Sequence, residues 1–263
     1  MTLWDLCEKS KECNSVEDGK SFRERAVYVL GMVLKKMSDR ETGSTEGDME
    51  RWWRLVCKFH QKGKQEEQEM GKWDRRRAEE HLQTCRIYMK RDMQEQKKIL
   101  TEEELTDYFY YRHVCCGKTT EDHGIVGGLF LCEALRRETW DWEKGSQAFC
   151  ALICHNAIIS GFGSVHRCAL GARLLELLLM GEAIDPLCYC SEEENEKIVC
   201  RWMQALEVEV WGKGVLLIPD TEYIPFDRYA EQILCAATKT GFWVSMDEKN
   251  CKIYIRGGNA DDC

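Results

Sequence analysis

The chain has 263 residues, 16 cysteines and a net charge of -9, and 44% of its residues are hydrophobic. This composition excludes a disordered chain, and the length allows one large domain or two small ones. Positions 1–100 carry 22 basic and 19 acidic residues, whereas positions 101–263 carry 15 and 27. The acidic C-terminal part disfavours a general nucleic-acid-binding surface there, because phosphate contacts need local positive charge.

The cysteines are interpreted as reduced thiols. Residues 1–14 are too charged for a secretory signal. Without export, a disulfide scaffold is not expected, so the thiols are core residues, metal ligands or nucleophiles. The apolar run at 174–180 is far shorter than the roughly 20 residues that a membrane span needs, so we expect a soluble protein without membrane contact.

Residues 1–70 are expected to form an N-terminal helical region. Apolar spacing predicts helices over 21–37 and 49–60, joined by a polar linker over 39–49. An apolar helix, a polar loop and a short helix ending in Leu-Val-Cys-Lys resemble an F-box. The residues that carry this likeness are Leu30, Leu34, Leu55 and Val56. A plain helical hairpin, with the same residues as core, is the alternative.

Residues 71–98 are expected to form a charged helical connector. The stretch contains Arg75-Arg76-Arg77 and further basic pairs. A solvated helix face explains this charge, and a nuclear-import or nucleic-acid patch is the alternative.

Residues 99–263 are expected to form a Cys/His-rich domain. Thr101 followed by three glutamates predicts a helix start, and this helix leads to His113, Cys115 and Cys116. The glycines at 124–128 lack the spacing of a phosphate-binding loop and are interpreted as a turn.

The stretch 150–180 combines thiols and imidazoles with the longest apolar helical pattern in the chain. Cys154, His155, His166 and Cys168 surround a glycine-containing turn at 160–164. The next predicted helix starts with a cap at Ser164 and ends at Gly181.

These residues suggest zinc, which prefers thiolate and imidazole ligands. One candidate ligand group is His113, Cys115 and Cys116, and the other is Cys154, His155, His166 and Cys168. Their spacing matches no regular zinc finger, and several of the cysteines could be small buried hydrophobic residues instead. A Cys154–His166 nucleophile and base is a weaker alternative, because a cysteine-rich chain offers such pairs by chance.

The C-terminal part is expected to be a mixture of helices and strands. A helix is predicted to begin near 198, strands over 208–218 with a turn at 212–214, a helix over 226–238 and a hairpin over 241–255. The predicted fold class is therefore α+β, with N-terminal helices, a central Cys/His-rich helical region that binds zinc, and C-terminal strands in a hairpin-containing sheet.

Several segments resemble the adenovirus early-region-four 34-kilodalton protein family, over about residues 85–255. The segment Ile99-Leu-Thr-Glu-Glu-Glu-Leu, followed by His113-Val-Cys-Cys, is similar to the family's Leu-Thr-Arg-Glu-Glu-Leu and His-Val-Cys. Cys150-Ala-Leu-Ile-Cys-His is similar to its Trp-Ala-Leu-His-Cys-His. The segment from Gly163 to Leu175, GSVHRCALGARLL, resembles its Gly-Ser-Leu-Gln-Cys-Ile-Ala-Gly-Gly-Gln-Val-Leu, in the same order along the chain.

The resemblance implies a non-enzymatic viral early protein of the host nucleus, with zinc as cofactor. Such a protein bridges a target to a host cullin–RING ubiquitin ligase through elongins B and C, by placing a helix in a groove of elongin C. The matching positions here are Ser164, Val165, Ala169 and Leu174.

Other partners follow from other features of the chain. An authentic F-box would recruit a Skp-type adaptor and cullin 1 instead. The family also works with an early-region-one-B partner, but its arginine-faced late helix has no match in this chain, so the resemblance gives little reason to expect that partner here. A zinc-stabilised RNA-export or nucleic-acid-binding factor that uses residues 72–98 is the second functional hypothesis.

Overall fold

The computed structural model describes residues 1–13, 22–37, 46–69, 123–137, 141–155, 169–189 and 196–257. The chain divides into two compact units. Unit 1 comprises Met1–Arg40 and Glu176–Cys263, and unit 2 comprises Glu41–Leu175. These bounds differ from the predicted ranges 1–70, 71–98 and 99–263. The connector at 71–98 lies outside the described residues, so that division stays a prediction.

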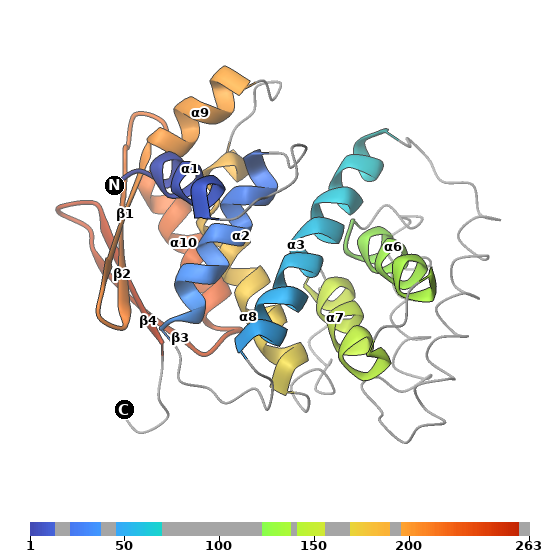
Figure 1. Cartoon of the computed structure of the whole chain (residues 1–263). Helices are drawn as coiled ribbons and strands as arrows, with labels where there is room; N and C mark the ends of the chain where they lie inside the picture. Colours follow the sequence, from blue (N-terminus) through green and yellow to red (C-terminus); the bar gives the residue numbers. More distant parts are fainter. Residues whose placement is uncertain are drawn as a thin grey trace, which may run out of the picture. The chain divides into compact units, whose positions relative to one another are not determined.

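Unit 1 contains a four-stranded antiparallel sheet with the strand order β1-β2-β4-β3 (Figure 1). Its strands form two hairpins. Their bounds are β1 Leu206–Trp211, β2 Gly214–Pro219, β3 Phe242–Asp247 and β4 Lys252–Gly257. The α+β class and the two predicted C-terminal hairpins are therefore confirmed.

Three helices contact the strands of this sheet and cover one of its faces (Figure 1). They are α1 Leu3–Cys13, α9 Glu196–Gln204 and α10 Phe226–Ala237. The helix α2 Phe22–Lys35 packs on α1 and α9, and the short 3-10 helix η3 Pro186–Tyr189 packs on α9. Side chains alternate between the two faces of the sheet. Val208, Leu217 and Ile253 lie opposite one another in register and are buried on the same face. The side chains between them point to the other face, since successive strand residues alternate.

The long apolar helix α8 spans Ala169–Ile184 and contains the boundary between the units. The prediction that it ends at Gly181 is wrong. Gly181 is a buried helical residue, and a Cβ there would be in ordinary contact with Val27 of α2. The helix instead ends where the Asp185 carboxylate accepts a hydrogen bond from the backbone N–H of Leu187.

Unit 2 is helical where it is described. Its helices are α3 Glu46–Glu69, α6 His123–Arg137 and α7 Trp142–Cys154, together with the first residues of α8. α3, α6 and α7 pack against one another around a core that includes Trp52, Trp53 and Leu135. Among the described helices of both units, none is both long enough and apolar enough to cross a lipid bilayer.

The turn predicted at residues 124–128 is a second error, because these glycines lie inside α6. Glycine weakens an isolated helix, but it also lets two helix backbones approach closely. The close approach of two helix backbones is the effect that matters for Gly127, which lies against the backbone of α3.

Candidate metal centre

His60 lies on the buried face of α3. The helix has apolar residues at spacings of three and four, which places them on one stripe. This stripe consists of Trp52, Trp53, Val56 and Phe59. His60 continues it and is only 1% exposed.

Two glycines bring His60 close to His123. A Cβ added to Gly63 would collide with the carbonyl oxygen of His123, and a Cβ added to Gly127 would collide with the carbonyl oxygen of Phe59. The backbones of α3 and α6 therefore touch at these positions. Because Gly63 lies one turn after His60 and Gly127 one turn after His123, this contact sets the two imidazoles side by side.

The third imidazole comes from the end of α7. Asp141 caps the start of this helix, since its carboxylate accepts a hydrogen bond from the backbone N–H of Lys144, 3.2 Å away. His155 follows the last residue of the helix and is 7% exposed. Its Nδ1 donates to the carbonyl oxygen of Leu152. A neutral ring that donates from Nδ1 carries its lone pair on Nε2.

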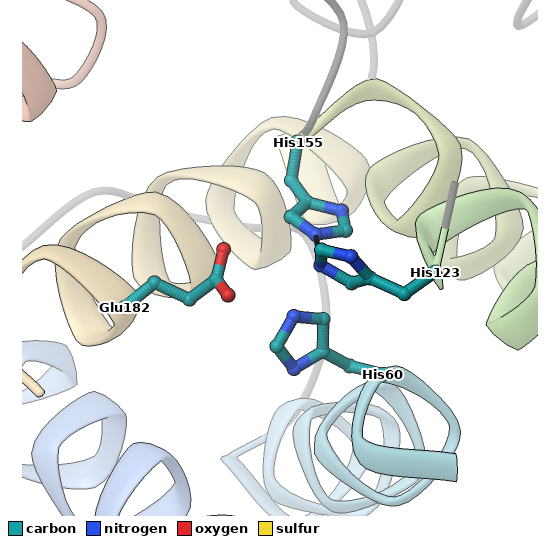
Figure 2. A group of neighbouring side chains, drawn as sticks. All are labelled: His60, His123, His155 and Glu182. Atoms are coloured by element: carbon teal, nitrogen blue, oxygen red, sulfur yellow. Dashed lines mark hydrogen bonds between the residues drawn. The ribbon is translucent and has the colours of Figure 1, made fainter. Parts of the chain in front are cut away.

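The three rings face one another (Figure 2). The ring centroids of His60, His123 and His155 lie 4.8, 5.0 and 5.1 Å apart, with interplanar angles between 59° and 76°. The Nε2 atoms of His123 and His155 are 3.0 Å apart. One ring nitrogen of each histidine lies within 4.8 Å of one ring nitrogen of the others. Glu182, also drawn in Figure 2, belongs to unit 1, and the site described here is formed by the three histidines.

Two arrangements fit the short distance between His123 and His155. In the first, His123 donates a hydrogen bond from Nε2 to the lone pair of His155. In the second, both lone pairs face a shared cation, and His60 supplies a third. The cluster could therefore hold a metal ion. Three imidazole nitrogens suit transition metals such as zinc or copper, whereas magnesium and calcium prefer oxygen ligands.

Among the zinc ligands predicted from the sequence, His155 is the one whose side chain the structure describes, and it belongs to the cluster. Cys154 is the last residue of α7, and its side chain is outside the described part of the chain. The other predicted ligands also lie outside the described residues, and they stay predictions: His113, Cys115, Cys116, His166 and Cys168.

The predicted elongin-binding residues are only partly described. Ser164 and Val165 lie outside the described residues, and Ala169 is the first residue of α8. Leu174 is 0% exposed. A buried side chain is not available to a partner's groove in this arrangement, which gives Leu174 less support than before, and its role in elongin binding stays a prediction.

The F-box-like residues are divided between the units. Leu30 and Leu34 are buried on α2 in unit 1. Val56 is buried and Leu55 half-buried on α3 in unit 2. The two helices therefore belong to separate cores, which does not support a single F-box hairpin.

Residue spacing did not identify His60 or His123 as ligands. The available signal was the apolar stripe of α3, where a histidine in line with tryptophans and valine is placed in the core. Two cysteines outside the predicted ligand groups, Cys57 and Cys150, are buried without a disulfide, as small hydrophobic residues often are.

Comparisons with family models, curated proteins and solved structures found no match to this chain. Its function must therefore be inferred from its own residues.

Proposed function

We propose that His60, His123 and His155 bind one zinc ion, and that the protein is a zinc-stabilised viral adaptor rather than an enzyme. The observation that carries the zinc proposal is the meeting of three imidazoles, two of them buried, from three different helical segments. Histidine is the commonest metal ligand in proteins.

Zinc fits the spacing of the His123 and His155 rings. Zinc bound at about 2.0–2.1 Å by imidazoles at tetrahedral angles brings their nitrogens to about 3.3–3.4 Å from one another. The 3.0 Å between the Nε2 atoms of His123 and His155 is close to that value. The hydrogen bond from His155 to the Leu152 carbonyl is also of the kind that orients metal-binding histidines.

The role of this zinc is structural. The ion would join the middle of α3, the start of α6 and the end of α7, all within unit 2. Tetrahedral zinc takes a fourth donor, and the predicted ligands outside the described residues are candidates. Because His60 and His155 are buried, a substrate would have little access to the metal.

The adaptor role is supported by the resemblance to the adenovirus 34-kilodalton family. Such a protein would bring a target to a host cullin–RING ligase in the nucleus, and the recruited enzymes would transfer the ubiquitin. The elongin route depends on Ser164, Val165 and Ala169, since Leu174 is buried. The Skp route has less support, since the F-box-like residues belong to two units.

Affinity purification of the full chain from expressing cells tests the adaptor role. Recovery of elongin C with cullin 2 or cullin 5 is the expected result, and Val165→Ala should reduce it. Recovery of a Skp-type adaptor with cullin 1 would favour the alternative route. Recovery of neither would reject the adaptor proposal but leave zinc binding, which is measured separately on the purified protein.

A further inference from the structure

Strand β1 forms one edge of the four-stranded sheet (Figure 1). The first residues of the chain pair with the first half of this edge. The Val208 backbone N–H donates to the carbonyl oxygen of Met1, 2.8 Å away, and Thr2 forms an antiparallel bridge with Glu207. Residues 209–211 lie beyond this pairing, and we call their outer side the open edge of β1.

The backbone of Val210 points outward at the open edge. In an antiparallel ladder, residues bonded to the neighbouring strand alternate with residues whose N–H and C=O point away from it. Val208 donates outward to Met1, so Val210, two residues later, also directs its N–H and C=O outward. No backbone hydrogen bond reaches Val210 from this side within the described part of the chain. An added strand would therefore find a donor and an acceptor there.

Side chains beside the open edge are exposed on both faces of the sheet. Val210 is 51% exposed and Trp211 is 54% exposed. Successive residues alternate, so Val210 lies on the same face as the buried Val208, and Glu209 and Trp211 lie on the other face. A strand added at this edge would place one side chain against Val210 and its two neighbours against Glu209 and Trp211.

The charge of this region favours a cationic partner. Unit 1 contains 24 acidic and 16 basic residues, whereas unit 2 contains 22 and 21. Glu207 and Glu209 lie on the same face as Trp211, and the residues opposite them on β2 are the apolar Ile218 and Leu216. Within the described residues, neither glutamate forms an ion pair. Both carboxylates are therefore available to a basic partner.

The basic residues of the sheet lie away from these carboxylates. The Arg256 guanidinium lies 4.3 Å from the centre of the Trp243 ring, and Lys252 lies opposite Asp247. Arg256 and Lys252 belong to β4, which is separated from β1 by β2, and Lys213 lies in the turn after β1. The β1 side of this face is therefore acidic and aromatic.

The backbone and the charges together select a protein segment. Peptide N–H and C=O groups match those of Val210, and basic side chains match the carboxylates beside it. A nucleic-acid strand has no such backbone amides, and its phosphates would meet Glu207 and Glu209.

We propose that the open edge of β1 binds an extended protein segment in which lysine or arginine alternates with aliphatic residues. The segment adds a strand antiparallel to β1, and its aliphatic residue exchanges backbone hydrogen bonds with Val210 and covers that side chain. The basic residue before it lies over the Trp211 indole, and the one after it pairs with Glu209. This surface lies within unit 1 and is independent of the proposed zinc site in unit 2.

The probe is a fluorescein-labelled peptide with the core Arg-Val-Arg-Val-Arg, titrated into the full chain and followed by fluorescence anisotropy. Any affinity tag stands at the C-terminus, because residues placed before Met1 would run along the same edge. We expect saturable binding that Glu209→Lys weakens by about tenfold or more, since like charges at an interface repel. Trp211→Ala should weaken it similarly, as loss of an interface tryptophan does.

Matched controls separate strand addition from simple charge attraction. A peptide with both valines N-methylated keeps its charges but loses the backbone donors, and it should bind at least about fivefold more weakly. Glu231→Lys makes the same charge change on an exposed position of α10 and should leave binding close to that of the wild type. Circular dichroism of each variant shows whether the sheet is retained, and Glu209→Gln provides a milder variant if Glu209→Lys misfolds.

Three results would overturn the proposal. The first is absence of saturable binding of the basic peptide to the folded protein. The second is equal binding of the plain and N-methylated peptides, or equal weakening by Glu209→Lys and Glu231→Lys, either of which would reduce the effect to general charge attraction. The third is binding of a labelled oligo-dT strand in place of the peptide, which would make this edge a nucleic-acid surface.

Discussion

Nε2 of His155 lies 3.0 Å from Nε2 of His123, although the two residues are 32 positions apart in the sequence. Both nitrogens are directed by their own helices: His155 by its hydrogen bond to Leu152 and His123 by its place at the start of α6. Because His60 faces the same point, the meeting of these rings depends on the packing of α3, α6 and α7.

Single replacements of the clustered histidines should remove the metal. We expect about one zinc per chain in the wild type and only a small residual fraction in His60→Ala, His123→Ala or His155→Ala, since three ligands form the site. Inductively coupled plasma mass spectrometry of the purified proteins measures this. Cys235→Ser is the control, because Cys235 is an exposed thiol on α10 in unit 1 and belongs to neither the cluster nor the predicted ligand groups. Full zinc in His60→Ala, combined with loss in Cys115→Ser or His166→Ala, would favour the ligands predicted from spacing.

The glycine contact between α3 and α6 should tolerate no side chain. We expect Gly63→Ala and Gly127→Ala each to lower the free energy of unfolding by about 3 kcal/mol, the upper part of the range for overpacking, because the new Cβ meets backbone atoms. Gly47→Ala on the same α3 is the control. A Cβ at Gly47 would meet nothing within 4 Å, so this change should raise stability by up to about 1 kcal/mol. Urea denaturation gives all three values, and equal effects at Gly47 and Gly63 would contradict the close crossing.

Removal of zinc should affect the two units differently. We expect removal of the zinc by a chelator to reduce the protection of backbone amides against hydrogen exchange in α3, α6 and α7. A structural metal contributes folding free energy to the unit that binds it. The strands of unit 1 should keep their slow exchange. Hydrogen–deuterium exchange with mass spectrometry reads both units in one sample. Uniform loss of protection in β1 to β4 as well would show that the metal's stabilising effect is not confined to unit 2.

The start of α1 should make a pH-dependent contribution to stability. The backbone N–H of Asp5 donates to the Thr2 hydroxyl, 3.2 Å away, and the Thr2 backbone N–H donates to the Asp5 carboxylate, 3.0 Å away. These hydrogen bonds form a capping box. Hydrogen bonding to Thr2 lowers the pKa of the Asp5 carboxyl below its ordinary 3.8. The Thr2 side chain has the largest effect on this pKa, and the Thr2 backbone has the second largest.

A depressed carboxyl pKa fixes the sign of the effect. The stabilisation is present above pH 3.8 and is lost as the pH falls through the lower pKa of the folded protein. We expect Thr2→Ala to cost about 0.5–2 kcal/mol at neutral pH, and this cost to shrink in acid. Thr221→Ala, in an exposed turn, is the control. An Asp5 pKa that does not rise in the Thr2→Ala variant, followed by NMR, would exclude the capping box.

The elements predicted best are those whose signals are local. The last hairpin turns at Asp247, whose carboxylate accepts hydrogen bonds from Asn250, and the turn residues were visible between two β-forming runs. The amphipathic pattern of α10 was equally direct, with Tyr229 and Ile233 buried one turn apart. Such signals need no knowledge of distant residues.

The candidate site was harder to predict because its residues are distant in sequence. His60, His123 and His155 lie on separate helical segments, so no spacing rule connects them. The glycines of α6 were misinterpreted for a related reason. Whether glycine ends a helix or permits a close helix crossing depends on a partner, and for Gly127 that partner is Phe59 of α3.

The division into units also affects the order of folding during synthesis. The chain of unit 1 is interrupted, since unit 2 occupies residues 41–175 between its two parts. The carbonyl of Met1 accepts a hydrogen bond from the backbone N–H of Val208, and Thr2 forms a bridge with Glu207. The ribosome must therefore deliver all of unit 2 before the first two residues can find their strand. During synthesis, α1 therefore cannot pack into the core of unit 1 until residues 176–263 have been made. Unit 2 is continuous in sequence, so it can fold while it leaves the ribosome.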